Sequence, residues 1–176
     1  TAVGYNSLLA NTTANNNTAI GYSSLLNNTT GSDNTALGKN ALQFVTTGSN
    51  NIALGKEAGK SLTTGSNNII IGEEAVASAV NASNQIVLGR EAVGHGDNIT
   101  VIGNTDMTAI HPADDNGVDL GSSSYEFKNL YVDGVAYLDG LDLNGTTVSA
   151  TAGEINILDG VTATAAELNL LDGVTS

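Results

Sequence analysis

The 176-residue sequence contains no cysteine and no tryptophan, and it has only two phenylalanines and one proline. Without cysteine, neither disulfide bonds nor thiol chemistry can contribute. Aromatic side chains usually dominate core burial, so their scarcity indicates a thin structure with a core of Ile, Leu, Val and Ala. No apolar run is long enough to span a membrane, and no signal peptide is recognisable. The chain starts in mid-repeat without methionine, and we expect it to be a piece of a longer protein.

Basic residues are also scarce, and the net charge of −13 is unevenly distributed. Residues 1–90 hold four acids and four bases, whereas residues 91–176 hold fourteen acids and one base. An acidic half disfavours binding to nucleic acid and to anionic lipid. We therefore expect no nucleic-acid partner and no membrane insertion, and we interpret the acidic surface as a solvated one.

What the sequence does contain is an internal repeat. The stretch "TTGSNNIALG" at residues 46–55 returns as "TTGSNNIIIG" at residues 63–72. Matching glycines recur at intervals of 17 residues, and a shortened interval of 14 leads to Gly103; the earlier members are Gly4, Gly21, Gly38, Gly55, Gly72 and Gly89. A unit this short cannot bury its own apolar face, so the repeat predicts stacked copies that share one core.

Each repeat predicts a short strand that ends at its glycine. The residue before the glycine is always aliphatic, and the residue two positions earlier is threonine or isoleucine, a period of two that is typical of a strand with one buried face. The residue between them is small in the first four repeats. Glycine suits the turn that follows. Beyond it, a second apolar column predicts a second strand: Leu8, Leu25, Leu42, Gly59, Val76 and Val93.

The loops between the predicted strands end in a column of amides: Asn17, Asn34, Asn51, Asn68 and Gln85. Two interpretations of this column stay open. Stacked amides can hydrogen-bond from copy to copy in a ladder. Alternatively, asparagine is present because it is a good turn residue.

The column directly after the glycine predicts how the surface of the stack is decorated. It reads Tyr5, Tyr22, Lys39, Lys56, Glu73 and Arg90. Stacking then gives an aromatic step at one end and, at the other, a charge ladder of Lys56, Glu73 and Arg90. If Tyr5 and Tyr22 are exposed, they are candidate receptor contacts, because tyrosine combines an apolar body with a polar tip. The alternative is that they pack against the next copy.

The second half of the chain has a different organisation. Residues 104–147 predict a β-rich connector, with alternation at Val118–Leu120 and Leu130–Val132 and Asp-Gly turns at 133–134 and 139–140. Residues 148–176 contain a 13-residue repeat whose Thr-x-x-Glu spacing is a helix capping box. Two-turn helices at 151–158 and 164–171 are marginal alone. We expect them to form a trimer core through Ile155, Leu158, Leu168 and Leu171.

The motifs "NTAIGYSSL", "NTALGKNAL" and "NIALGKEAG" resemble the head repeats of YadA-like trimeric adhesins. The resemblance implies a left-handed parallel β-roll over residues 1–103, with three chains side by side and the small column near the trimer axis. The usual repeat of that family is 14 residues, and the three extra residues here fall in the Asn/Thr/Gly loop. The segments "DNGVDLGSSSYEFKNLYVDG" and "TATAAELNLLDGVTS" are similar to the shafts of bacteriophage tail fibres.

Candidate chemical sites are few. His95 and Asp97 lie in a Gly-rich turn, but one histidine and one carboxylate fall short of a metal site. Asp114, Asn116 and Asp119 only partly match a calcium loop. The aspartates of the "LDG" turns, Asp139, Asp159 and Asp172, are expected to point outward. We predict no metal, no cofactor and no enzymatic activity, since no carboxylate pair recurs with an aromatic sugar platform.

Together these patterns predict a mainly β chain with a structural and adhesive role in a homotrimeric phage tail fibre. It would be extracellular, on the virion, in contact with other tail proteins and with a host receptor, either a glycan or a protein. One alternative is the head of a bacterial trimeric autotransporter-type adhesin. The outside alternative is a polysaccharide-degrading tailspike.

Overall fold

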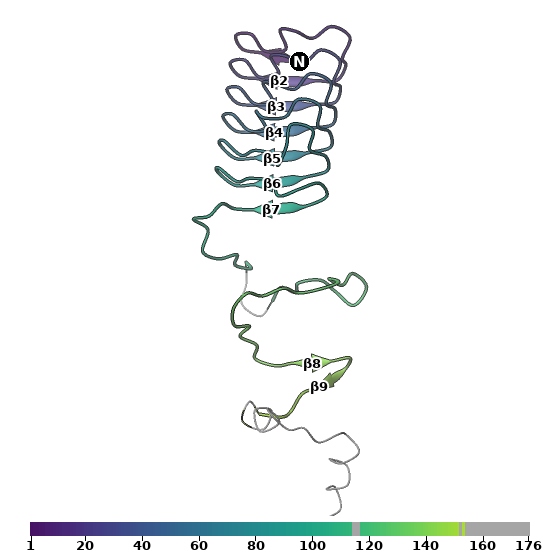
Figure 1. The fold of residues 1–176 in the computed structure, drawn as a ribbon, viewed down its shortest axis with the longest axis vertical. Helices are drawn as coiled ribbons and strands as arrows, with labels where there is room; N and C mark the ends of the chain where they lie inside the picture. The colour runs from purple at the N-terminus through teal and green to yellow at the C-terminus, as the bar shows by residue number, and fades with distance from the viewer. Residues whose placement is uncertain (114–116, 152, 154–176) are drawn as a thin grey trace, which may run out of the picture. The chain divides into compact units, whose positions relative to one another are not determined.

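The computed structural model describes residues 1–113, 117–151 and 153 of the chain (Figure 1). The chain divides into two compact units, Thr1–Pro112 and Ala113–Ser176. The first unit is a parallel β-solenoid, called the roll below, whose coils stack in chain order (Figure 1). The chain is therefore mainly β and solenoidal, as its repeats predict.

One short strand from each coil, or rung, contributes to a seven-stranded parallel sheet. Neighbouring rungs pair in register, so that Ala19 lies beside Ala36, 17 residues later, whereas Val87 lies beside Val101. The sequence repeat is thus the rung itself. The strands are β1 (Ala2–Val3), β2 (Thr18–Ile20), β3 (Thr35–Leu37), β4 (Ile52–Leu54), β5 (Ile69–Ile71), β6 (Ile86–Leu88) and β7 (Thr100–Ile102).

The period-two alternation is confirmed, but the buried face is the opposite of the expected one. The middle residue of β2 to β6 is fully buried inside the roll, and it is Ala19, Ala36, Ala53, Ile70 or Val87. The bulky residues on either side of it point outward instead. The small column therefore lines the roll's own interior, which corrects the placement near a trimer axis. The reason is that the narrow interior of a rung has room for one small side chain at this position.

The interior keeps its volume when a larger residue enters the middle column. Gly59 occupies the position that holds Leu42 in the previous rung. A methyl group added to Gly59 would lie 2.7 Å from Cδ2 of Leu42 and 3.2 Å from Cδ1 of Ile70. The absent side chain at Gly59 thus makes space for Ile70, and the core stays close-packed.

The second predicted strand is wrong. Leu8, Leu25 and Leu42 have φ angles of 52°, 48° and 49° and lie in turns, and only Val76 and Val93 form an isolated parallel bridge. A left-handed conformation costs a leucine about 1–2 kcal/mol. Hydrogen bonds between rungs hold it there, such as the Leu25 N–H to the Ala41 carbonyl at 3.0 Å. This column therefore stacks by backbone bonding without forming extended strands.

The amide column forms a ladder, which settles the question that the sequence left open. The Oδ1 atom of Asn34 accepts hydrogen bonds from the backbone N–H and the Nδ2 of Asn51, both at 3.0 Å. The Nδ2 of Asn51 also donates to the Gly65 carbonyl at 2.9 Å. Asn68 continues the pattern, and all three side chains are fully buried. Each amide thereby satisfies backbone groups that a buried turn would otherwise leave unpaired.

The loops stack in the same manner until the last rung, which is shorter. The Ser49 N–H donates to Oγ of Ser66, and at the shortened rung the Ser83 N–H donates to Oδ1 of Asp97, 14 residues later. Because Val76 still pairs with Val93 at the full spacing, the three missing residues fall between Val93 and Asp97. The variable length therefore lies in the loop, as expected.

The second unit contains an antiparallel hairpin of β8 (Asp142–Leu143) and β9 (Thr146–Thr147). Asn144 and Gly145 both have positive φ, the conformation of the tight two-residue turn that Asn-Gly favours. The strands predicted at 118–120 and 130–132 are absent, and the Asp-Gly pairs at 133–134 and 139–140 lie at simple bends. Side chains in these segments are exposed, so a single chain gives them nothing to pack against.

Candidate functional site

Tyr5 and Tyr22 form the predicted aromatic step. Each follows the glycine of its rung, and the two ring centroids are 5.4 Å apart with an angle of 18° between the planes. Because parallel rings in contact are about 3.5–4 Å apart, the larger separation reflects a lateral offset that leaves part of each face uncovered. The residues are 68% and 51% exposed. The pair is therefore both stacked and accessible, and its role as a receptor contact stays a prediction.

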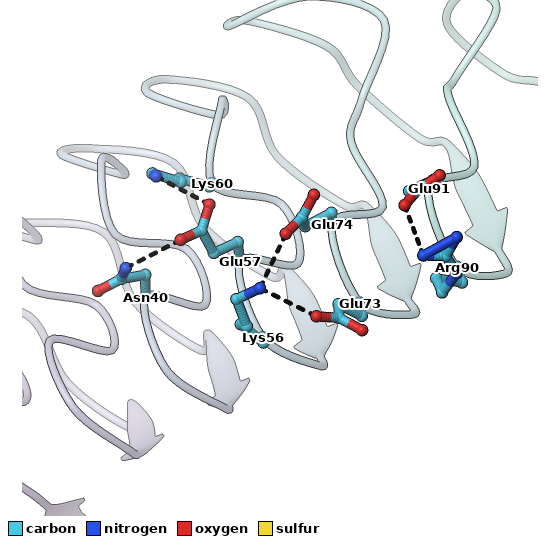
Figure 2. A network of polar contacts seen from close by, with 8 residues as sticks. All are labelled: Asn40, Lys56, Glu57, Lys60, Glu73, Glu74, Arg90 and Glu91. Carbon is cyan, nitrogen blue, oxygen red and sulfur yellow. Dashed lines mark hydrogen bonds and ion pairs between the residues drawn. The ribbon is translucent and has the colours of Figure 1, made fainter.

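The charge ladder begins as predicted, with Lys56 between two carboxylates of the next rung (Figure 2). Its Nζ lies 2.9 Å from Oε1 of Glu73 and 2.9 Å from Oε1 of Glu74. Hydrogen bonds from Glu74 and Glu73 raise the pKa of Lys56 well above its ordinary value. The same contact with Lys56 lowers the pKa of Glu73. Both groups therefore stay charged over the whole neutral range.

Two further ion pairs flank this contact (Figure 2). Lys60 Nζ lies 2.9 Å from Oε2 of Glu57, and Asn40 donates to the other oxygen of that carboxylate at 3.3 Å. The hydrogen bond from Lys60, followed by that from Asn40, lowers the pKa of Glu57. Arg90 departs from the prediction, because it pairs with Glu91 of its own rung and not with Glu73. A neighbouring carboxylate one residue away is simply closer than one in the previous rung.

The outer face of the roll's sheet is apolar along its whole length, and sequence reasoning missed it as an exposed surface. We call it the aliphatic face. Its side chains range from partly buried to 55% exposed. A signal for it was present, since a small residue flanked by two bulky ones must place the bulky pair outside a narrow coil. The face comprises Val3, Ile20, Leu37, Leu54, Ile71, Leu88 and Ile102, together with Ile52, Ile69 and Ile86.

The second unit also exposes most of its apolar residues. Leu120, Tyr131 and Tyr137 are 80%, 88% and 93% exposed. In the described residues from 117 to 150, only Gly121 and Val148 are even partly buried. Burial of apolar surface is the main favourable term in folding, so this segment needs a partner to gain it.

The sequence candidates for metal binding do not assemble. Asp97 accepts hydrogen bonds from the Ser83 N–H at 2.8 Å and from Gln85 Nε2 at 3.4 Å, so its carboxylate closes the last rung. His95 lines an open cavity of about 440 Å³ together with Glu91 and Asp106. Nowhere in the described residues do three His, Cys, Asp or Glu side chains gather closely enough to hold a metal ion.

Several predicted positions lie outside the described residues. They are the two-turn helices at 151–158 and 164–171, the trimer core of Ile155, Leu158, Leu168 and Leu171, the aspartates Asp159 and Asp172, and two residues of the partial calcium loop, Asp114 and Asn116.

Comparison with protein-family models, with curated proteins and with solved structures finds no match for this chain. No helix in the described part of the chain combines the length and hydropathy needed to cross a membrane.

Proposed function

We propose that the chain is a structural and adhesive segment of a homotrimeric bacteriophage tail fibre, exposed on the virion and in contact with a host surface. Three left-handed rolls would stand side by side, followed by a shaft. The aliphatic face is the observation that carries the assembly. The sequence motifs that resemble adhesin heads and fibre shafts support the biological role.

The energetics of the aliphatic face favour self-association. Full burial of a Leu, Ile or Val side chain contributes about 1.5–3 kcal/mol. These side chains are already partly covered, so roughly 1 kcal/mol remains for each, or on the order of 10 kcal/mol per chain. This is enough to offset an association cost of about 4–15 kcal/mol when several chains bury the face together. Soluble monomers rarely expose so continuous an apolar strip.

The assembly is tested by light scattering on the purified chain, which should give the mass of a trimer. Ile71→Asp should convert the trimer to smaller species, because it buries an uncompensated charge at the contact. Val80→Asp is the matched control, because Val80 is exposed but lies on a loop away from the aliphatic face. A folded wild-type monomer, or equal loss of mass in both variants, would contradict the proposed assembly.

The adhesive role is tested on virions whose fibre carries this chain. Gold-labelled antibodies against the roll should decorate tail fibres in electron micrographs, whereas labelling of a bacterial cell surface would favour the autotransporter alternative. Replacing Tyr5 and Tyr22 together with serine should reduce adsorption to host cells. Unchanged adsorption would remove the tyrosine pair as the receptor contact.

A further inference from the structure

Two charged residues of the roll are left without an ion pair. Within residues 33–91, salt bridges of 2.6–2.9 Å join every other acidic and basic side chain to a partner. Lys39 and Asp33 are both exposed, and neither makes a salt bridge with any described residue. Asp33 accepts only a neutral hydrogen bond, from Nδ2 of Asn16 at 3.0 Å.

Both residues belong to the same rung, and Asp33 is exceptional in its column. The residue that precedes the buried amide has a positive φ in every rung, and in the other rungs it is an asparagine: Asn16, Asn50, Asn67, Asn84 and Asn98. Asparagine therefore satisfies the backbone requirement. The carboxylate of Asp33 adds a negative charge that the fold does not need, in the same rung as the only unpaired base of residues 1–91.

The strand β3 separates the two side chains. Asp33 precedes Thr35 by two residues and Lys39 follows Leu37 by two, so they lie at opposite ends of the strand on the outer sheet. A strand rises about 3.3 Å per residue, which places the two charges too far apart to pair within one chain. Each lies instead at one edge of the aliphatic face.

Symmetry brings the two edges together. When identical rolls are related by rotation about an axis parallel to the direction of stacking, every rung stays at the same height. The end of one chain's strand then meets the start of its neighbour's strand at the same rung. This gives a heterologous contact that closes into a ring.

We propose that Lys39 of each subunit forms an ion pair with Asp33 of its neighbour, and that this ring of pairs fixes the subunits in parallel and in register. The inference rests on the proposed self-association. In the other rungs the corresponding edges pair an asparagine with Tyr22, Lys56, Glu73 or Arg90, so no other rung offers opposite charges. A slip by one rung would place Lys39 against Asn16 or Asn50, and it would lose every one of these contacts.

The test uses a carbodiimide, which joins an amine to a carboxylate only when the two are in direct contact. Treated wild-type protein should give covalent dimers and trimers on a denaturing gel. The variants Asp33→Asn and Lys39→Gln should each lose these bands while keeping the oligomeric mass in light scattering. Asp33→Asn introduces the residue that the column holds elsewhere, so the variant retains the fold.

Co-assembly of the two variants separates contact between chains from contact within one chain. The Asp33→Asn chain supplies only Lys39 and the Lys39→Gln chain supplies only Asp33, so their mixture should recover the covalent dimer. A trimer that shows no cross-link dependent on these two residues would overturn the ion pair and leave the proposed assembly standing. A monomer in light scattering would overturn both.

Discussion

Replacing Asn51 with leucine should remove one link of the buried amide ladder with little change in side-chain volume. Three backbone or side-chain groups lose their contact with the Asn51 side chain. The Gly65 carbonyl loses the donor at 2.9 Å, the Asn68 N–H loses the acceptor at 3.1 Å, and Nδ2 of Asn68 loses the same acceptor at 2.9 Å.

The magnitude follows from what remains unpaired. Nδ2 of Asn68 keeps its bonds to the carbonyls of Ser66 and Ala82, so it adds little. The Gly65 carbonyl and the Asn68 N–H are left buried without a partner. Each such group costs about 1–3 kcal/mol, so we expect a loss of about 2–6 kcal/mol in the free energy of unfolding.

Urea denaturation followed by circular dichroism at fixed protein concentration measures this loss. Thr47→Ala is the matched control in the same rung, because Thr47 is exposed and surface substitutions usually change stability by less than about 0.5 kcal/mol. A loss below about 1 kcal/mol for Asn51→Leu would refute the reasoning, since it would mean that water or backbone relaxation replaces the ladder at little cost.

Two more predictions concern the glycine column and the charge network. Gly38→Ala should destabilise the roll strongly, because Gly38 has a φ of 135° and its new Cβ would lie 2.4 Å from the Gly55 carbonyl oxygen, whereas Gly134→Ala should be neutral because nothing lies within 4 Å of its Cβ position; equal urea midpoints would contradict this. The lowered pKa values of Glu57 and Glu73 give stability that is complete above their ordinary value of 4.5 and lost as the pH falls below it. The raised pKa of Lys56 gives stability that is complete below 10.5 and lost only at higher pH. Urea midpoints should therefore be flat from about pH 5 to about pH 10 and fall on both sides, and a midpoint that rises on acidification would be the contrary result.

Much of the roll is determined by local rules that a sequence displays directly. The interval between glycines sets the length of a rung, and each glycine is required because the next rung's carbonyl occupies the place of a Cβ atom. The period of two in "TAIG" and "TALG" marks a strand, since alternate side chains of a strand must point to opposite faces. The column of stacked tyrosines and the contact of Lys56 with Glu73 follow from the same register.

The tertiary structure decided what depends on the shape of the coil. Whether Ala36 or its neighbours Thr35 and Leu37 face inward cannot follow from alternation alone, because both choices alternate equally well. The narrow interior selects the small side chain, and it turns the aliphatic residues into an exposed surface. The same confinement bends the chain at Leu25 into a left-handed turn, where the pattern of apolar residues suggested a strand.

The choice of polar partners also required the folded coil. The sequence left the amide column between a ladder and ordinary turn propensity, and only the spacing of stacked loops brings Asn34 and Asn51 within hydrogen-bonding distance. Arg90 turns to Glu91 because side-chain reach, and not column alignment, selects between two carboxylates. Local periodicity thus determined which residues share a column, and the close packing of one coil on the next decided which way each column faces and what it touches.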